Sequence, residues 1–523
     1  MDAIALPQDL ASAHALILEM HARLHDLRGR YEDLQFELER IAKRMYGRRS
    51  EQLDPAQMQM AFAALQAEVA ARGAACVPPA PPEPTPPPAR PRQAGHGRRP
   101  LPPHLPRERR VVEPPPEDLV CPCCGEAKVK IGEDVSEQLD FVPATFKVIQ
   151  TARPKYACPT CKEGVTVALV PRAPIAKGLA TAGVLSHVVV SKYVDHQPLH
   201  RLTTMFGRLG VPLSRQTLCG WVGQVFALLA LVEEALWRSV LSSQVLGADE
   251  TPVKVLQEGR RQCARGYLWC YLGDRGEVVF DFSMGRRAET PVRALEEFHG
   301  RVLLCDAYAG YDRVERTKPD LVRAGCMAHA RRGVYEAQDT DPPRALVLLA
   351  EFRLLYDVEA AIREAPCATE EERHALAYAL RQERSVPVLA RMKEHVERYH
   401  TEILPKSPLG KAVGYLRNQW DHLTRFAADG ALAIDNNAVE REIRTVAVGR
   451  GNWTFIGHED AGPWAARLYG LLGTCRLQGV NPFEWLKDVL ERIHDHPRDR
   501  MHELTPRLWK AARAPPGGVS GVT

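Results

Sequence analysis

The sequence has no long hydrophobic run and no recognisable secretory leader. Its 523 residues contain no stretch of about 18 consecutive apolar residues, which a membrane-spanning helix requires. The N-terminus, MDAIALPQDL, lacks the basic segment and following apolar segment of a signal peptide. We therefore expect no membrane span and a cytoplasmic location.

The sequence also lacks a strong net charge and a regular cysteine framework. The formal net charge is only +4, so any surface for a polyanion must come from local basic clusters. The thirteen cysteines are odd in number, and most stand singly within apolar runs. This distribution is typical of reduced thiols and argues against stabilisation by disulfides.

Residues 1–55 carry a heptad repeat with a basic end. The seam consists of Leu10, Ile17, Leu24, Tyr31, Leu38 and Met45, interleaved with Ala13, Met20, Leu27, Leu34 and Ile41. A seam of about five heptads predicts a coiled coil that can pair two subunits. A single amphipathic helix packed on its own domain is the alternative. Arg48 and Arg49 at its end can contact phosphate.

Residues 77–116 are a predicted linker, because sixteen of these forty positions are proline. A segment so poor in backbone donors packs no core and should be extended. Its second half is rich in arginine, so Arg98 and Arg99 can add non-specific affinity for phosphate. A solubilising spacer is an equally good interpretation.

Residues 117–170 contain two CxxC pairs with metal-ligand spacing, in CPCCG and CPTC. Four thiolates suit one tetrahedral Zn²⁺, so this spacing predicts a structural zinc ribbon. The predicted ligands are Cys121, Cys124, Cys158 and Cys161. The segment between the pairs reads as two strands but is longer than in usual ribbons, so unmetallated cysteines are the alternative. Cys123 can compete as a ligand.

Residues 175–235 are predicted to be helical, and LSRQTLCGWVGQV resembles the second half of a helix-turn-helix. Ser214 would cap a helix that carries Arg215 near its start, where recognition helices meet base edges. A plain helical packing unit is at least as good an interpretation.

From residue 243 the pattern changes to strands. SQVLGADETPVKV is an apolar run ending in Asp249 and Glu250, and RGYLWCYLGD and EVVFDFS are two strands joined by a turn. A short helix, TPVRALEEF, precedes RVLLCDAYAGY, a strand ending at Asp306, and a further strand and helix follow. This is the order of the ribonuclease H-like fold, in which the first and fourth strands are adjacent and parallel. Asp249 and Asp306 are therefore expected to project near each other from one side of the sheet.

Two neighbouring carboxylates repel each other, and a divalent cation relieves that repulsion. Carboxylate oxygens suit Mg²⁺, and a pair of such ions can activate an attacking oxygen and stabilise a leaving one. A third ligand is expected downstream, in GALAIDNNAVEREIR. There Asp435 is a good N-cap, so Glu440 and Arg444 fall one turn apart on one helix face, whereas Glu442 points to another side.

The predicted fold class is multidomain α+β. Beyond the coiled coil, zinc ribbon and helical DNA-binding region, we expect a ribonuclease H-like α/β core with an all-helical insertion. The core covers residues 243–336 and 430–460, the insertion residues 337–429, and a C-terminal helical segment residues 461–510.

The sequence resembles the insertion sequence 66 transposases of bacteria over nearly its whole length. The shared motifs run in one order, from YGRRSEQL, LPPHLPRE and CPCCG…ACPTC, through SKYVDHQPLHR, ADETPVKV, CDAYAGY, GCMAHARR and KSPLGKAVGYLRNQW, to DNNAVEREIR, VGRGNWTFIG and RLQGVNPFEWL. The number and order of these motifs make the resemblance specific.

The resemblance implies a DDE transposase that cleaves element ends with two Mg²⁺ (or Mn²⁺) ions and joins the 3′-OH to target DNA. By motif, Asp249, Asp306 and Glu440 would be the catalytic metal ligands. The implied partners are double-stranded DNA (terminal repeats and target), a second subunit in a homodimer and small accessory proteins of the same element. The protein would then be associated with the nucleoid.

The residues expected to contact DNA are arginines gathered in several segments. They are Arg48, Arg49, Arg98, Arg99, Arg215, Arg331, Arg332, Arg441, Arg444 and Arg450. His329, with its two neighbouring arginines in GCMAHARR, can contact DNA or simply begin a helix.

Two positions depart from the family pattern. Gly451 stands where the family often has lysine, and Gly473 where it often has glutamate. An inactive relic of a transposase is therefore one alternative. A DNA-binding regulator would explain residues 1–235 but leave the three carboxylates unused. A nuclease that cleaves without strand transfer is the remaining alternative.

Overall fold

The computed structural model describes residues 55–71, 145–156, 166–169, 171–257, 259 and 262–513. The predicted linker, the four predicted zinc ligands and residues 1–54 of the predicted coiled coil lie outside these residues. The chain forms two compact units. The insertion unit comprises the described parts of Met1–Pro78, Leu304–Ala307 and Arg323–Asn437. The sheet unit comprises the described parts of Pro79–Leu303, Tyr308–Val322 and Ala438–Thr523.

A five-stranded sheet with the order β5-β4-β3-β6-β7 organises the mixed α+β fold. The strands are β3 (Val245–Val255), β4 (Ala264–Gly273), β5 (Val278–Ser283), β6 (Val302–Leu304) and β7 (Val322–Ala324). β3, β4 and β5 pair antiparallel in chain order. The first and fourth strands, β3 and β6, are neighbours, as the sequence predicted.

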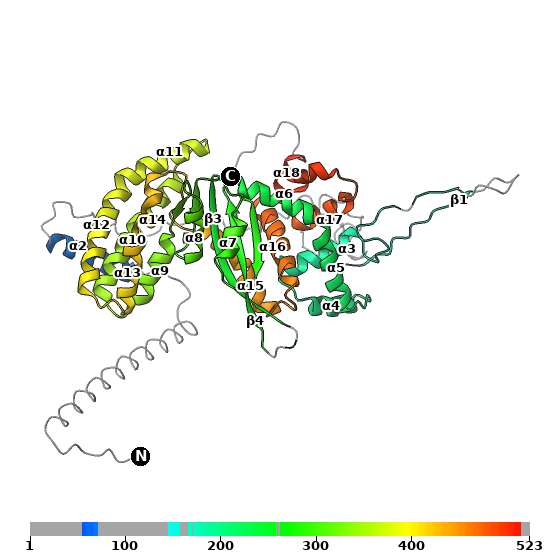
Figure 1. Ribbon diagram of the computed structural model, residues 1–523, viewed down its shortest axis with the longest axis horizontal. Helices are drawn as coiled ribbons and strands as arrows, with labels where there is room; N and C mark the ends of the chain where they lie inside the picture. Colours follow the sequence, from blue (N-terminus) through cyan, green and yellow to red (C-terminus); the bar gives the residue numbers. More distant parts are fainter. Residues whose placement is uncertain are drawn as a thin grey trace, which may run out of the picture. The chain divides into compact units, whose positions relative to one another are not determined.

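β4 forms the hydrophobic centre of the sheet unit. Four consecutive side chains, from Leu268 to Tyr271, are fully buried, so both faces of this strand are covered. On β5 lies α16 (Ala461–Leu477), whose Gly470 lets the helix approach the strand closely. Figure 1 shows α16 beside the strands. The turn from β4 to β5 uses Gly276 at φ +68°, a conformation that favours glycine.

The remaining described elements of the sheet unit are helices and one short strand pair. They are β1 (Lys155–Tyr156) with β2 (Thr166–Val167), α3 (Ala182–Tyr193), α4 (Leu199–Arg208), α5 (Arg215–Leu228), α6 (Ala230–Leu241), α7 (Glu289–Ala294), α8 (Ala309–Thr317), α15 (Asn437–Trp453, whose first residue belongs to the insertion unit), α17 (Pro482–Arg492), the 3₁₀ helix η4 (Arg498–Leu504) and α18 (Pro506–Ala511). No single described helix is long and apolar enough to span a membrane; α5 and α6, bent by 54° at their junction, pass that test only together.

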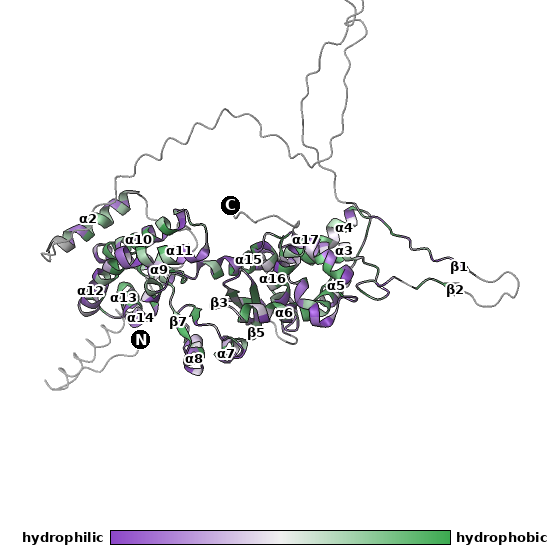
Figure 2. Ribbon diagram, turned by 90° about the horizontal axis from the view of Figure 1, so that it is seen from above, coloured by the Kyte–Doolittle hydropathy of each residue, from purple (hydrophilic) through white to green (hydrophobic). Residues whose placement is uncertain are grey.

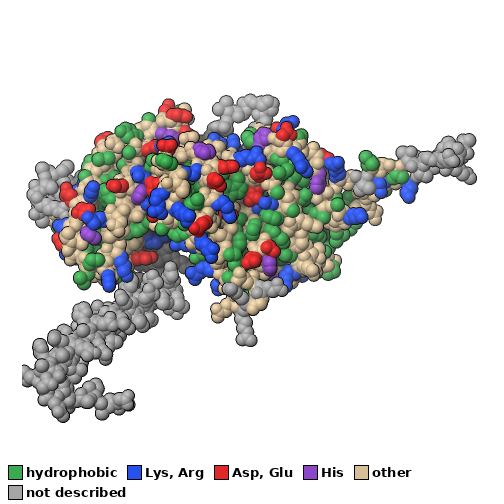
Figure 3. All heavy atoms as spheres, viewed as in Figure 1, with side chains coloured by type: hydrophobic (Ala, Val, Ile, Leu, Met, Phe, Trp, Pro, Cys, Tyr) green, Lys and Arg blue, Asp and Glu red, His purple; other side chains and the backbone are tan. Residues whose placement is uncertain are grey.

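The insertion unit is helical between its entry and exit segments. Its elements are α2 (Pro55–Ala71), α9 (Met327–Ala337), α10 (Pro342–Glu364), α11 (Glu370–Leu380), the π-helix η2 (Arg381–Ser385), α12 (Val386–Glu402), α13 (Pro408–Asn418), α14 (Trp420–Thr424) and the 3₁₀ helix η3 (Arg425–Ala428). Figure 2 shows that these helices carry both hydrophobic and hydrophilic residues, as amphipathic helices around a core do. In the face of the protein seen in Figure 3, basic and acidic side chains are interspersed.

Helix α2 is bound to other helices of the insertion unit by an apolar cluster and by hydrogen bonds of Glu68. Phe62 and Leu65 are buried against Val347 and neighbouring residues of α10. One turn beyond, Glu68 accepts a hydrogen bond of 2.7 Å from the Tyr399 hydroxyl, and its other oxygen lies 3.0 Å from Nδ1 of the buried His395. This contact ties the segment that follows the predicted coiled coil to α12.

We expect Leu65→Ala to loosen α2 without unfolding the sheet unit. Removal of a fully buried leucine from a packed cluster costs about 2–5 kcal/mol, which should lower the free energy of local opening of α2. Hydrogen exchange should therefore accelerate in residues 55–71. Met60→Ala is the matched control, because Met60 is 62% exposed on the same helix. Equal protection of α2 in both variants would contradict the docking described.

Candidate active site

Asp249, the first predicted metal ligand, lies inside β3 rather than at its end. The strand continues to Val255, six residues further, so the prediction of an apolar run ending at Asp249 was wrong. Asp249 is partly buried opposite Cys270 of β4, and its Oδ1 accepts a 2.8 Å hydrogen bond from the Glu250 backbone. Burial raises the pKa of the Cys270 thiol, and the negative charges of Glu442 and Asp249 raise it further. Cys270 is therefore a neutral packing residue.

Glu250, the neighbour of Asp249, is committed to other side chains. Its carboxylate is only 2% exposed and pairs with Arg286, which follows β5. The Tyr311 hydroxyl of α8 donates to its second oxygen at 3.1 Å. Successive side chains of a strand point to opposite faces, so Asp249 and Glu250 leave β3 on opposite sides of the sheet.

Asp306 follows β6 by two residues, so the predicted strand ends slightly earlier than expected. Within the insertion unit, its carbonyl oxygen accepts a hydrogen bond of 3.2 Å from the buried Arg323, whose other terminal nitrogen donates to Gln419. Burial raises the pKa of Tyr415, and the negative charge of Asp306 adds to that shift. Asp306 therefore lies in a segment that Arg323 fixes to α13 and its following loop.

Glu440 stands in the first turn of α15, which begins at Asn437. Asp435 lies one position before the capping residue of this helix, so the predicted N-cap was displaced by one residue. Its Oδ1 still accepts a 3.1 Å hydrogen bond from the Asn437 backbone, and its Oδ2 accepts one from the Tyr356 hydroxyl at 2.9 Å. These bonds fix the start of the helix that carries Glu440.

Glu442 has a structural role on the same helix. Its side chain is 4% exposed and forms an ion pair with Arg476 of α16, which also donates to Thr445 at 2.8 Å. Burial raises the pKa of Glu442, and the Arg476 charge opposes that rise. The prediction that Glu442 points to a different side from Glu440 agrees with this packing.

The departure at Gly473 has a packing explanation. A Cβ at this position of α16 would lie 3.0 Å from Val278 Cγ1 and 3.3 Å from Glu442 Oε2. A glutamate there would bring a second carboxylate to the buried Glu442. The position of Gly451 is different, because no atom lies within 4 Å of a Cβ built there. A lysine at 451 would therefore add a side chain without disturbing the local packing.

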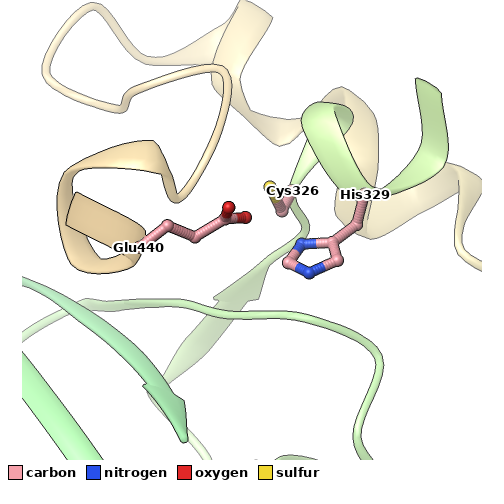
Figure 4. A group of neighbouring side chains, drawn as sticks. All are labelled: Cys326, His329 and Glu440. Atoms are coloured by element: carbon pink, nitrogen blue, oxygen red, sulfur yellow. The ribbon is translucent and has the colours of Figure 1, made fainter. Parts of the chain in front are cut away.

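Helix α9 begins beside the segment that leads into α15. Its Met327 amide donates to the Ile434 carbonyl at 3.1 Å, and the Asn436 amide donates to Cys326 Sγ at 3.2 Å. A ligand atom of Cys326 and one of His329 lie within 4.8 Å of each other at this helix start. Figure 4 draws both side chains together with Glu440. The sequence analysis proposed His329 as a possible DNA contact and did not propose a role for Cys326. The two side chains lie close together because they are three residues apart at the start of a helix.

The other predicted DNA-contacting arginines differ in their surroundings. Arg441 and Arg444 are exposed on α15, and Arg331 and Arg332 are partly buried on α9. Arg450 donates to Thr251 Oγ1 at 2.9 Å and therefore ties α15 to β3. The predicted arginines at positions 48, 49, 98 and 99 lie outside the described residues.

The predicted helix-turn-helix region contains two consecutive helices, α4 and α5, joined by residues 209–214. Ser214 caps α5, as predicted, since its Oγ accepts a 3.0 Å hydrogen bond from the Thr217 backbone. Arg215 is exposed at the helix start. Both a DNA-reading helix and a plain packing unit are compatible with this arrangement.

Comparison with known families defines the class of protein to which these features belong. Residues 177–463 match the family described as Transposase IS66 family, and residues 118–162 match the zinc-finger binding domain of transposase IS66. Residues 470–507 match the IS66 C-terminal element, and residues 33–110 the family described as Transposase C of IS166 homeodomain. The chain therefore belongs to the IS66 transposase family.

Relatives in Sinorhizobium fredii (strain NBRC 101917 / NGR234) share most of the chain. The uncharacterized protein y4hP is 33% identical over 80% of this chain and 78% of its own length. The uncharacterized protein y4jD is 35% identical over 79% of this chain and 82% of its own length. The similarity thus extends well beyond a single motif.

We expect Arg476→Ala to destabilise the sheet unit by about 3 kcal/mol, because it leaves the buried Glu442 carboxylate without its cation. Burial already raises the pKa of Glu442, and loss of Arg476 should raise it further, so the folded state of the variant binds more protons than the unfolded state. The free energy of unfolding should then fall as the pH rises above the ordinary glutamate value of about 4.5.

Urea denaturation of Arg476→Ala at several pH values would measure this loss. The double variant Glu442→Gln, Arg476→Ala is the control, because it removes the buried charge along with its partner. It should recover much of the stability and show a flatter pH profile. A single variant as stable as the wild type at neutral pH would refute the structural role of the pair.

Proposed function

We propose that this protein is a DDE transposase that cleaves the ends of its element and joins the freed 3′-OH to target DNA. The observation that carries the proposal is the placement of Asp249 within β3 and of Asp306 just after β6, since β3 and β6 are neighbours in the sheet. Membership of the IS66 transposase family supports the same reaction class.

The order of the sheet supports a ribonuclease H-like core. In chain order the five strands lie as third, second, first, fourth and fifth, with α7 between the third and fourth. The neighbouring first and fourth strands are the ones that carry or precede the two aspartates. We take Glu440, from the first turn of α15, as the third ligand on the strength of its motif.

The proposed ligand set suits Mg²⁺ or Mn²⁺. All three donors are carboxylates, the hard oxygen ligands that these ions favour. Two bound ions would supply activation of the attacking oxygen and stabilisation of the leaving oxygen. The chain's own contribution is to position the carboxylates. Asp435 accepts a hydrogen bond at the start of α15, which carries Glu440, and Arg323 donates one to the backbone of Asp306.

The chemistry requires no covalent enzyme intermediate. In cleavage, a water oxygen attacks the phosphorus and the bond to the 3′ oxygen breaks, which leaves a 3′-OH. In strand transfer, that hydroxyl attacks a target phosphorus; its oxygen bonds to the phosphorus, the bond from the phosphorus to the target strand's 3′ oxygen breaks, and that oxygen leaves as a 3′-OH. Positioning and charge stabilisation supply most of the rate in such reactions.

The DNA would be held by residues that precede the core and by residues of the core itself. We propose contacts from the exposed Arg215, Arg441 and Arg444, and from the arginines of the N-terminal half. A homodimer paired by the heptads would hold two element ends together. The protein would act in the cytoplasm on nucleoid DNA, with any accessory proteins of its element.

Removal of any one proposed ligand should abolish cleavage. Asp249→Asn, Asp306→Asn and Glu440→Gln keep the shape of each side chain but remove a negative charge. Each should lower the Mg²⁺-dependent cleavage rate by roughly a thousandfold, about 4 kcal/mol of transition-state stabilisation. The assay uses a duplex with the inverted repeat that borders the gene, and Glu442→Gln is the control that should retain activity.

The outcomes separate the competing functions. No cleavage by the wild type would favour an inactive relic or a DNA-binding regulator. Cleavage without strand transfer into a target plasmid would favour a nuclease. Activity retained in Glu440→Gln would show that another residue is the third ligand.

The four cysteines of the matched zinc-finger segment should hold a structural zinc ion. We expect the purified protein to contain about one zinc per chain by elemental mass spectrometry. Cys121→Ser, Cys124→Ser, Cys158→Ser and Cys161→Ser should each lose that zinc. Cys123→Ser is the matched control and should retain it. If Cys123→Ser lost the zinc and Cys124→Ser retained it, Cys123 rather than Cys124 would be the ligand.

A further inference from the structure

Phe455 is an exposed aromatic residue that follows a strained turn of the sheet unit. Helix α15 ends at Trp453, and Thr454 follows with φ +61°, a left-handed conformation that a β-branched residue rarely adopts. The Thr454 amide donates to the Arg450 carbonyl at 3.0 Å, and the Phe455 amide donates a hydrogen bond of 2.7 Å. The Phe455 side chain is nevertheless 43% exposed. A strained backbone beside an exposed ring is typical of functional sites.

The residue after Phe455 adds a short extension to the sheet. Ile456 forms a parallel bridge with Val255, the last residue of β3, and both side chains are buried. The Ile456 amide donates to the Lys254 carbonyl at 2.8 Å. Because successive side chains of an extended chain point to opposite faces, Phe455 and Lys254 lie together on the other face, where both are exposed.

Arg265 completes a row of side chains on this exposed face. In the register of β3 and β4, Lys254 is directly opposite Arg265, and the Arg265 side chain is also exposed. The bridge of Ile456 places Phe455 on the other side of Lys254. The three side chains therefore form an aromatic–basic row, in which an aromatic ring stands beside two adjacent cations.

The two cations of the aromatic–basic row lack anionic partners within the described part of the chain. Neither the Lys254 nor the Arg265 side chain forms an ion pair or a hydrogen bond there. Like charges directly opposite each other destabilise a pair of strands. This repulsion is relieved when an external anion binds to both cations.

Two acids that follow the row in the sequence are bonded to other side chains. Glu459 accepts a hydrogen bond from Gln257 at 3.3 Å. Asp460 Oδ2 lies 3.2 Å from Nδ1 of His458. These acids therefore do not neutralise the cations of the aromatic–basic row.

An exposed ring beside two cations matches the chemistry of single-stranded DNA. An unpaired base exposes a face that stacks on an aromatic side chain, and the phosphates of the strand attract cations. In a duplex each base face is covered by the neighbouring base pair, so the ring has no face on which to stack. The row therefore fits an unpaired strand better than a duplex.

We propose that Phe455, Lys254 and Arg265 form a binding site for an unpaired DNA strand, with the ring on a base and the cations on adjacent phosphates. This inference rests on the proposed function, because the ligand is taken to be a strand freed by cleavage. Lys254 lies five residues beyond Asp249 and on the opposite face of β3, about 17 Å away at the rise of a strand. The site therefore meets DNA away from the cleaved bond.

Binding of a labelled oligothymidylate in EDTA tests the site without catalysis. The double variant Lys254→Gln, Arg265→Gln should weaken binding by about tenfold and lower the slope of log affinity against log salt by about 1.4, since each cation displaces about 0.7 counterion from a single strand. It should unfold at a urea concentration no lower than the wild type does, because it removes opposed like charges. Lost binding is then not a result of unfolding.

The double variant Arg363→Gln, Lys393→Gln is the matched control for charge. It removes one arginine and one lysine from exposed positions of α10 and α12, so the net charge changes equally. Its affinity for oligothymidylate and its salt slope should stay close to those of the wild type.

Substitutions of Phe455 separate stacking from hydrophobic packing. Phe455→Leu keeps an apolar side chain but loses the ring, so it should weaken oligothymidylate binding by about tenfold and leave the salt slope unchanged. Phe455→Trp keeps a ring and should retain the affinity. Binding of a duplex should change little in either variant. Tyr378→Leu is the control, because Tyr378 is an aromatic residue of α11 that is 49% exposed.

The outcomes distinguish this site from the proposed function. Wild-type affinity for oligothymidylate in both the Lys254→Gln, Arg265→Gln variant and Phe455→Leu would overturn the proposal. Equal losses of duplex and single-strand binding in Phe455→Leu would also overturn it. If the wild type binds oligothymidylate through these residues but does not cleave the end duplex with Mg²⁺, the proposed function fails while the single-strand site stands.

Discussion

Removing a charged carboxylate from water costs free energy unless the carboxylate pairs with a cation. Ion pairs of this kind recur throughout the sheet unit. Three glutamates there have side chains that are at most 4% exposed, and each pairs with an arginine from another element. The pairs are Glu250 with Arg286, Glu277 with Arg507, and Glu442 with Arg476. These bonds connect β3 to the segment after β5, the turn between β4 and β5 to α18, and α15 to α16. Each of these arginines therefore ties together two parts of the sheet unit.

The same constraint separates acids that look equivalent in the sequence. Asp249 precedes Glu250, and Glu440 lies two residues before Glu442. In each case the second acid is tied to an arginine and points away from the first, because of the two-residue period of a strand or the turn of a helix. An acid bound in this way does not compete for a divalent ion. The proposed metal site therefore takes Asp249 and Glu440 rather than Glu250 and Glu442.

The sequence predicted the periodic features well and the long-range contacts poorly. The order of strands and helices, which is that of the ribonuclease H-like fold, predicted that β3 and β6 are neighbours, and the sheet has this order. The ion pair of Arg286 with Glu250 could not be predicted, because the two residues are 36 positions apart in the sequence and only folding brings them together. The binding of α2 to α10 escaped prediction for the same reason. The displaced cap at Asp435 reflects the usual uncertainty of helix ends.

Glu440 was the hardest of the proposed ligands to derive, because a long helical sequence separates it from the strands. Within the insertion unit, however, the entry and exit of that insertion are bonded together. The Met327 amide donates a hydrogen bond to the Ile434 carbonyl, and the Asn436 amide donates one to Cys326 Sγ. When the ends of an inserted segment are clamped, the length between them has little effect on the rest of the chain. The start of α15 is therefore set by the beginning of α9 rather than by the hundred or so residues between them, and this start places Glu440, the proposed third ligand, in the first turn of the helix.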